Sequence, residues 1–361
     1  MGFGTIYKHI QFLLVFRPWE CRATIQDMTW DMLGHEWAAD LLREHVAQGS
    51  FRHAYLFTGP QGIGRRTLAL RLAQALNCPQ PLAPGVPCRT CHTCTRLERM
   101  EHPDLAVLQS EQVGGTLKVE QVRDLQHSLS LSPYEARYRV ALLLRFEEAH
   151  ISAANALLKT LEEPPPQVVL ILTAQNAESL LPTIVSRCEE LRLRPLQAET
   201  VSQGLQERWG LSSEQSRLLA HLSGGRPGYA LYLAQDKARL DQRKHWLEDH
   251  QKLLTASRVD RFAFSESHAK DKEQLRQILM VWLSLWRDVL LRASGSSAPL
   301  TNLDREDEIE ALATGLGLPV ASNMVSAVQR TLDLIDRNVN ARLAMDVLTL
   351  DLPRTNGSSD R

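Results

Sequence analysis

A chain of 361 residues is too long for one ordinary domain, so two or three domains are expected. Hydrophobic residues make up 43% of the sequence and charged residues 23%, which is the composition of a folded globular protein. The formal net charge is −1, and the Lys and Arg residues are scattered along the chain. A dedicated nucleic-acid-binding protein usually carries a basic stripe, so any contact with DNA is expected to be shared with partners.

The first residues predict neither a membrane anchor nor a secretion signal. The apolar run from Ile10 to Phe16 is interrupted by Gln11 and is far shorter than the ~20 residues of a membrane-spanning helix. Six cysteines in a long chain without a secretory cleavage pattern also argue against a disulfide scaffold. We therefore expect a cytoplasmic protein without a membrane partner. Residues 1–27 lack periodicity and are expected to be disordered or non-native, with a domain beginning at Met28.

The first regular segments are a predicted helix at residues 37–46 and a strand at 54–58. A glycine-rich loop at 59–64 and a second helix at 67–76 follow. The pattern of the first helix places four side chains on one side, namely Trp37, Leu41, Leu42 and His45. The order strand, glycine loop, helix is the opening of a nucleotide-binding βαβ unit.

Three further apolar runs are predicted strands, at residues 105–108, 140–144 and 168–172. Helical patterns at residues 117–129 and 152–161 separate these runs, and three consecutive prolines end the second helix. Strands that are apolar throughout and alternate with helices indicate a parallel sheet covered on both faces. The predicted fold class is therefore α/β.

From about residue 198 onward the patterns are helical, with a break at residues 224–228 and a final helix at about 340–350. A wide apolar stripe in this part is formed by Trp282, Leu285, Trp286, Val289 and Leu290. The predicted organisation begins with an α/β domain at residues 28–197, which contains an inserted cysteine module at residues 78–94. A small helical domain at 198–240, a larger helical domain at 241–353 and a disordered tail at 354–361 follow it.

The glycine-rich loop departs from a working ATP-binding P-loop. In the P-loop pattern of Gly, four residues, Gly, Lys and Ser or Thr, backbone N–H groups hold phosphates, the Lys neutralises charge and the hydroxyl binds Mg²⁺. Gly59, Gly62 and Gly64 are present here, but Arg65 occupies the lysine position and Arg66 the hydroxyl position. A guanidinium cannot bind Mg²⁺ and is a poor replacement for a compact ammonium.

Two more features argue against ATP hydrolysis. Thr67 carries a hydroxyl but lies one residue too late in the loop. The strand that should end in a metal-binding Asp and a catalytic Glu is followed instead by Arg145, Phe146, Glu147 and Glu148. A nucleotide fold that has lost hydrolysis explains these departures together, and ATP binding without turnover stays open.

Four cysteines follow the pattern Cys-x₉-Cys-x₂-Cys-x₂-Cys, at Cys78, Cys88, Cys91 and Cys94. Thiolates at this spacing can turn toward one tetrahedral zinc ion, and the proline-rich loop 79–87 needs such a staple. An iron–sulfur cluster is the alternative for four thiolates. Because four thiolates leave no open coordination position, the site is predicted to be structural, with His92 as a bystander.

Two motifs resemble the signatures of bacterial clamp-loader AAA+ subunits. These are the run Ala-Ala-Asn-Ala-Leu-Leu-Lys-Thr-Leu-Glu-Glu-Pro-Pro at residues 153–165 and the Ser-Arg-Cys of residues 186–188. The cysteine cluster, residues 53–60 and the closing motif at 338–344 fit the same family. The resemblance covers residues 28–353 and implies an AAA+ domain, a helical lid domain and a helical collar domain.

Two subunit types of this family are similar to the chain. The gamma/tau type has an intact lysine loop and hydrolyses ATP, whereas the delta-prime type often has a degenerate loop. The loop and the short length of this chain favour delta-prime, which implies a non-hydrolysing scaffold in a hetero-pentameric ring with gamma/tau and delta subunits. Such a ring is a component of the DNA polymerase III holoenzyme and loads the sliding clamp onto primed DNA. An ATP-hydrolysing gamma/tau-type subunit is the alternative, and a stand-alone zinc-containing nucleic-acid-binding protein is a third hypothesis.

The resemblance also implies roles for two arginines. Arg187 would act in trans as an arginine finger on the ATP of a neighbouring gamma/tau subunit, and the alternative is a structural ion pair with Glu189 or Glu190. Arg226 lies where AAA+ lids place a nucleotide sensor, or it serves only to start a helix. The degenerate nucleotide site, expected to be inactive, then comprises Gly59, Gly62, Gly64, Arg65, Arg66, Thr67 and Arg226.

Overall fold

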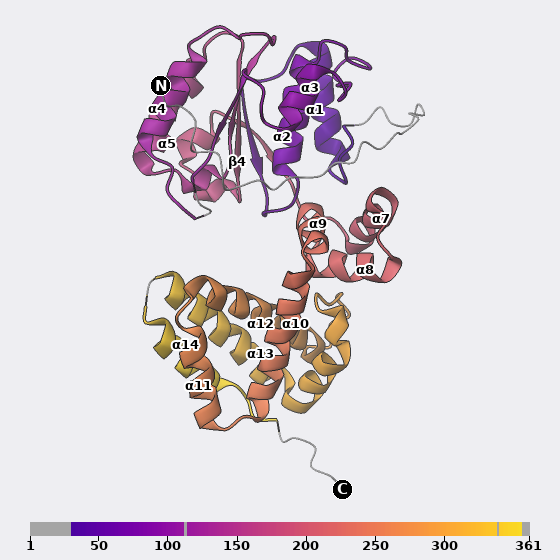
Figure 1. Ribbon diagram of the computed structural model, residues 1–361, viewed down its shortest axis with the longest axis vertical. Helices are drawn as coiled ribbons and strands as arrows, with labels where there is room; N and C mark the ends of the chain where they lie inside the picture. Colours follow the sequence, from indigo (N-terminus) through magenta and orange to yellow (C-terminus); the bar gives the residue numbers. More distant parts are fainter. Residues whose placement is uncertain (1–29, 112–113, 338, 356–361) are drawn as a thin grey trace.

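The computed structural model describes residues 30–111, 114–337 and 339–355 (Figure 1). The expectation for residues 1–27 and most of the expectation for the tail at 354–361 lie outside the described residues. The chain forms an α/β region at one end, helices α10–α14 at the other, and helices α7–α9 between them.

The α/β region contains a parallel five-stranded sheet with the order β2-β3-β4-β1-β5. Its strands are β1 Ala54–Thr58, β2 Leu105–Leu108, β3 Arg139–Leu143, β4 Val168–Ala174 and β5 Glu189–Arg192. Every residue of the central strands β1 and β4 is buried, as their continuous apolar sequences predict. The predicted α/β class with a parallel sheet is confirmed.

Helices cover both faces of this sheet (Figure 1). They are α1 Glu36–Gln48, α2 Arg65–Asn77 and α3 His92–Glu98 on one face, and α4 Val119–Leu129, α5 Ile151–Glu162 and α6 Pro182–Val185 on the other. Side chains of β1 alternate between the two cores: Tyr55 and Phe57 face α1–α3, whereas Leu56 faces α4–α6. Short 3₁₀ turns at Phe146–Glu148 and Ala177–Ser179 follow β3 and β4.

The predicted side of the first helix is wrong in one respect. Trp37 is 51% exposed, and α1 buries Ala38 and Ala39 together with Leu42, which belongs to the predicted side. Small alanines allow α1 to approach α2 closely, and the fully buried Trp30 just before the helix supplies the aromatic side chain of this core. The bulkiest residue of a short helix therefore did not mark its buried face.

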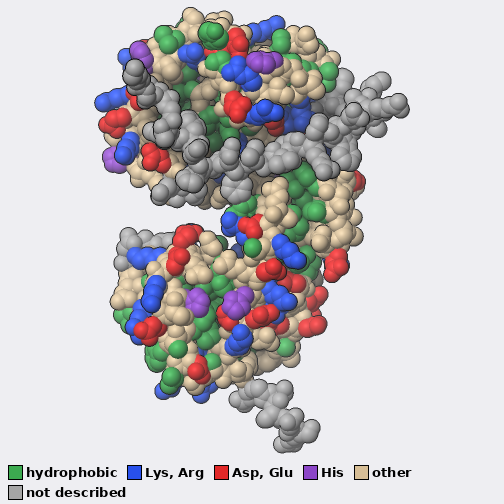
Figure 2. Space-filling view, in the orientation of Figure 1, with side chains coloured by type: hydrophobic (Ala, Val, Ile, Leu, Met, Phe, Trp, Pro, Cys, Tyr) green, Lys and Arg blue, Asp and Glu red, His purple; other side chains and the backbone are tan. Residues whose placement is uncertain are grey.

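The rest of the described chain is helical. It contains α7 Ala198–Trp209, α8 Ser213–Leu222, α9 Pro227–Gln235, α10 Lys237–Thr255, α11 Arg258–His268, α12 Lys272–Ala293, a 3₁₀ turn at Leu303–Arg305, α13 Glu306–Asp336 and α14 Ala341–Asp351. The predicted break at residues 224–228 falls between α8 and α9, where Gly224 and Gly225 adopt positive φ angles. On the face shown in Figure 2, Lys and Arg side chains are interspersed with Asp and Glu.

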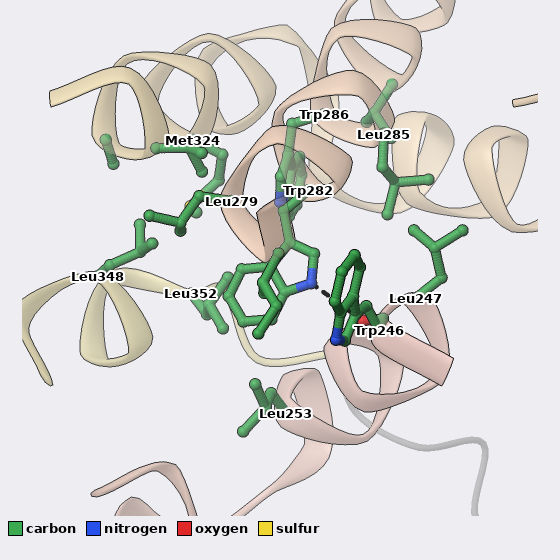
Figure 3. Close-up of a cluster of buried hydrophobic side chains, with 14 of the residues drawn as sticks. Trp246, Leu247, Leu253, Leu279, Trp282, Leu285, Trp286, Met324, Leu348 and Leu352 are labelled. Carbon is green, nitrogen blue, oxygen red and sulfur yellow. Dashed lines mark hydrogen bonds between the residues drawn. The ribbon is translucent and has the colours of Figure 1, made fainter. Parts of the chain in front are cut away.

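The core of α10–α14 is built around three tryptophans (Figure 3). The indole N–H of Trp282 donates to the backbone carbonyl of Trp246 at 3.0 Å, and that of Trp286 donates to Nε2 of His250 at 3.0 Å. Complete burial lowers the pKa of His250 to about 3, which keeps its ring neutral and able to accept this bond. The predicted stripe is confirmed as a core, with Trp282, Leu285, Trp286 and Val289 fully buried.

One segment, Leu303–Ile335, is long and apolar enough to cross a membrane when judged by length and composition alone. In the structure its helix α13 packs along α12, and Ile309, Ala321 and Val328 are fully buried in the shared core. The helix is interrupted at Gly317, which has a φ of 72° just before Pro319. This packing is that of a core helix in a helical domain.

Candidate functional site

The four predicted cysteine ligands lie together at the end of α2 and the start of α3. Their Sγ atoms all lie within 4.8 Å of one another, and Cys78 and Cys94 are buried. Backbone N–H groups of Cys88, Cys91 and Cys94 each donate to the sulfur of the preceding cysteine in the set, at 3.3, 3.3 and 3.4 Å. This arrangement can hold one metal ion with four sulfur ligands.

The pKa values of these thiols are shifted in both directions. Burial raises the pKa of Cys78 and of Cys94. Burial acts in the same direction on Cys88, but hydrogen bonds from the backbone N–H groups of Cys91 and Thr90 outweigh it and lower the pKa of Cys88 to about 6. Since metal ligands must be thiolates, a bound dication would supply the charge that the buried pair lacks.

Neighbouring residues also support the cysteine module through hydrogen bonds and close contacts. The indole N–H of Trp30 donates to the carbonyl of Gly85 at 2.9 Å, and the amide of Gln74 donates to the carbonyl of Cys94 at 2.8 Å. Gly85 has a φ of 73°, and a Cβ at this position would lie 2.3 Å from the carbonyl oxygen of Arg43. The proline-rich loop is thus anchored on α1 and α2, which fits a structural role.

The glycine loop joins β1 to α2 and contains three glycines with positive φ angles. Gly59, Gly62 and Gly64 have φ angles of 144°, 82° and 113°, which residues with side chains rarely adopt. Helix α2 begins at Arg65, directly after the last of these glycines. Three glycines are present, and the predicted departure from the P-loop pattern lies in the side chains of residues 65 and 66.

Arg65 is buried at the start of α2, whereas Arg66 and Thr67 are exposed. Nη1 of Arg65 has no hydrogen-bond partner among the described residues. Burial lowers the pKa of Arg65, the carboxylate of Glu147 opposes this shift, and Arg145 adds to it. The cation at the lysine position is therefore enclosed by protein, and the hydroxyl of Thr67 is turned to solvent.

Helix α9 lies directly on the glycine loop. The backbone N–H of Gly228 donates to the carbonyl of Gly62 at 2.8 Å, and a Cβ on Gly62 would lie 2.8 Å from both N and Cβ of Tyr229. Arg226 precedes α9, donates through Nε to the carbonyl of Ser223 at 2.6 Å, and lies over the Tyr229 ring at 4.4 Å. The sequence does not predict the hydrogen bond from Gly228 to Gly62, because this bond joins backbone atoms.

The acidic residues after β3 are held in a local network. Arg145, with a φ of 50°, donates through Nε to both carboxylate oxygens of Glu148 at 3.0 Å. Burial raises the pKa of Glu148, but the Ser110 hydroxyl, the Gly114 N–H and Arg145 lower it below its usual value. Glu148 thus stabilises the loop after β3. Of the two acidic residues in this loop, Glu147 is the one that lies near Arg65.

Arg187 lies just after α6 and forms a different ion pair from the two considered in the sequence analysis. Its Nη2 is 2.6 Å from Oε1 of Glu162, the last residue of α5. Glu189 instead faces Arg52 and His45, at 3.8 and 3.9 Å, and Glu190 accepts from the hydroxyl of Thr58 at 2.7 Å. The alternating pattern of β5 turns these two carboxylates toward other partners.

Comparison with known proteins gives consistent similarities. A family model described as "DNA polymerase III, delta subunit" matches residues 34–197. The DNA polymerase III subunit delta' of Pseudomonas aeruginosa is 37% identical over 61% of this chain and 67% of that protein. The subunit delta' of Bacillus subtilis is 29% identical over 86% of this chain and 94% of that protein.

Two further proteins are similar over different shares of the chain. The DNA polymerase III subunit tau of Escherichia coli is 34% identical over 49% of this chain and 27% of that protein. Among solved structures, a DNA polymerase III gamma subunit-related protein of Thermotoga maritima is 18% identical, with a TM-score of 0.44, over 86% of this chain and 97% of that one.

Proposed function

Because this chain belongs to the family of DNA polymerase III delta-prime subunits, we propose that it is the non-hydrolysing scaffold subunit of a clamp loader. The observation that carries this proposal is the glycine loop. It keeps the three glycines, but Arg65 fills the lysine position from a buried site, and helix α9 lies on the loop through the bond from Gly228 to Gly62. A subunit of this kind contributes to the complex through its surfaces rather than through its own ATP turnover.

The proposed partners are gamma/tau and delta subunits in a hetero-pentameric ring that loads a sliding clamp onto primed DNA in the cytoplasm. Residues 28–197 would form the AAA+ domain, 198–240 the lid, and 241–353 the collar. The large core around the tryptophans of α10–α14 supports a collar that is rigid enough to join subunits. Direct contact with DNA would be shared, because the whole chain has a net charge of only −1.

We also propose that zinc is held by Cys78, Cys88, Cys91 and Cys94. Four thiolate ligands with no open position are typical of a structural zinc site, in which the ion supplies folding free energy and no reaction chemistry. The support given to the module by Trp30 and Gln74 is consistent with this role.

Arg187 is proposed to act in trans on the ATP of a neighbouring gamma/tau subunit. Its side chain is 34% exposed and follows the short helix α6, whose Ile184 is fully buried, so the guanidinium lies at the surface next to a packed helix. A guanidinium at a fixed position can balance the charge that develops during phosphoryl transfer, provided that it needs little reorganisation.

The test is a complete complex reconstituted from this chain, its gamma/tau and delta subunits, the sliding clamp and primed DNA. Arg187→Ala is expected to lower clamp-dependent ATP turnover and clamp loading, while zinc content and assembly stay unchanged. An arginine finger contributes roughly 10³–10⁵ in rate at its own site, and the other ATP sites of a ring dilute this loss. Arg194→Ala, at an exposed arginine, is the matched control. Normal turnover by the Arg187→Ala complex would refute the role in trans.

ATP turnover by the isolated chain would instead favour the gamma/tau-type alternative. Arg65→Ala distinguishes a real site from contamination, because turnover that depends on Arg65 must come from this loop. Steady-state hydrolysis measured with and without this substitution decides between the two subunit types.

A further inference from the structure

The guanidinium of Arg187 is held from two directions. Nη1 donates to the backbone carbonyl of Thr183 at 2.8 Å and lies 3.4 Å from the hydroxyl of Ser186. Nη2 donates to Oε1 of Glu162 at 2.6 Å. Thr183 and Ser186 are local to α6, so Glu162, at the end of α5, is the one partner among the described residues that reaches this guanidinium from another element.

Both ends of the ion pair are anchored in one core. Leu161, the residue before Glu162, is 2% exposed, and its carbonyl lies 3.0 Å from the imidazole Nε2 of His53. Ile184, on α6, is fully buried in the same cluster, and its carbonyl accepts the backbone N–H of Arg187 at 3.1 Å. The carboxylate and the guanidinium therefore have fixed bases, and their separation is set by packing beneath them.

We infer that Glu162 is the positioning residue of Arg187: its carboxylate, fixed at the end of α5, holds the guanidinium in the orientation in which it meets a neighbour's phosphate. This inference rests on the proposed role of Arg187 in trans. Without Glu162 the two Nη1 contacts fix only one edge of the guanidinium, and the long side chain regains rotamer freedom.

The pair leaves donors free for a phosphate oxygen. A guanidinium has five N–H donors, and three hydrogen bonds are formed here, so two donors are left. The side chains of Arg187 and Glu162 are 34% and 52% exposed, so a phosphate can approach without displacing the carboxylate. An ion pair this exposed contributes little to folding stability, so a purely structural role predicts almost no effect of its removal.

The matched control is the next residue in the chain. Glu163 is exposed at the same helix end, and its side chain forms no hydrogen bond or ion pair with the described residues. Glu162→Ala and Glu163→Ala therefore remove the same charge from nearly the same place. Glu162→Gln keeps an oxygen acceptor for Nη2 and tests whether hydrogen bonding alone holds the guanidinium.

The experiment measures clamp-dependent ATP turnover of the complete complex containing each variant. Glu162→Ala is expected to lower kcat about two- to fivefold, the range open to an exposed ion pair, with KM for ATP unchanged. Glu162→Gln should recover most of this loss, and Glu163→Ala should match the wild type. In the Arg187→Ala background, Glu162→Ala should have no further effect, because the two residues act as one unit. Melting temperature and metal content of each isolated variant verify folding.

Other outcomes separate this inference from the proposed function. If Arg187→Ala leaves turnover unchanged, the role in trans fails. If Arg187→Ala lowers turnover but Glu162→Ala behaves like Glu163→Ala, the role in trans stands and the positioning role is overturned. If Glu162→Ala raises turnover, the carboxylate restrains the arginine rather than positions it, and the inference is overturned as well.

Discussion

The cysteine module and the glycine loop lie at opposite ends of the same helix, α2, and differ in what they keep. At the C-terminal end, Cys78 and three further cysteines form a complete ligand set supported by surrounding hydrogen bonds. At the N-terminal end, the glycines keep the backbone of a phosphate site, but the cation at the lysine position is buried Arg65. The four cysteines could hold a metal ion, whereas the loop keeps its glycines but carries Arg65 and Arg66 at the positions of the lysine and the hydroxyl.

The contacts of Gly62 suggest a packing role for the glycine loop. The carbonyl of Gly62 accepts a hydrogen bond from Gly228, and Tyr229 packs against the position where a Cβ would lie. The loop thus packs against α9, and this contact needs no phosphate. A glycine-rich loop can therefore serve the packing of a helix from another region of the chain.

The largest expected effect concerns the module. Cys91→Ser removes one thiolate from the set, so the variant should lose its metal and be destabilised by roughly 3 kcal/mol or more. Elemental analysis and thermal unfolding of the purified chain measure both effects. The control is Cys188→Ser, because Cys188 lies outside the set and burial raises its pKa to about 12. Equal metal content in the two variants would contradict the assignment of these ligands.

A pH dependence follows from the same thiols. Since burial raises the pKa of Cys78 and Cys94, both are protonated near neutral pH in the metal-free chain. Metal binding must release these protons, so affinity is expected to rise with pH and to fall as the pH is lowered. Calorimetric titration of metal-free protein in buffers of different ionisation enthalpy counts the released protons. Release of fewer than two near neutral pH would contradict this expectation.

The contact between the glycine loop and α9 predicts an intermediate effect on local stability. Gly62→Ala forces a Cβ to within 2.8 Å of the backbone N and the Cβ of Tyr229 at a φ of 82°, which should cost roughly 3 kcal/mol locally. Hydrogen exchange of the Gly228 amide should then accelerate about 100-fold, because its bond to Gly62 is lost. Gly210→Ala is matched for backbone strain, with a φ of 65° and nothing within 4 Å, and should leave this amide protected. Unchanged exchange in Gly62→Ala would show that α9 does not depend on the loop.

The elements that the sequence predicts are those whose side chains form a clear hydrophobic pattern. Strands β1 and β2 were predicted at their observed bounds because every residue in them is apolar or buried in a continuous run. Strand β5 reads Glu-Glu-Leu-Arg and lies at the sheet edge, where only Leu191 is buried, so it gives almost no hydrophobic pattern. Helix α3 is short, and Cys94 and its polar residues conceal its period.

The functional contacts show the same division. The four cysteines converge as their spacing predicts, because a metal site restricts residue type and distance together. The partner of Arg187 was sought among its near neighbours, but Glu162 lies on another helix and only the packing of α5 against α6 brings it close. The bond from Gly228 to Gly62 involves no side chain at all, so residue identity cannot reveal it.

The smallest expected effect is the most direct test of whether side chains alone separate this loop from an active one. Arg65→Lys combined with Arg66→Thr restores the P-loop pattern, yet ATP turnover by the isolated chain should stay undetectable. The metal-binding Asp is still missing at the end of β3, where Arg145 is tied to Glu148, and α9 still contacts Gly62. Steady-state hydrolysis and binding of a fluorescent ATP analogue measure the outcome, with Arg65→Ala combined with Arg66→Ala as control. Substantial turnover by the restored pair would mean that two side chains were the whole defect, and that the contact with α9 does not restrict the site.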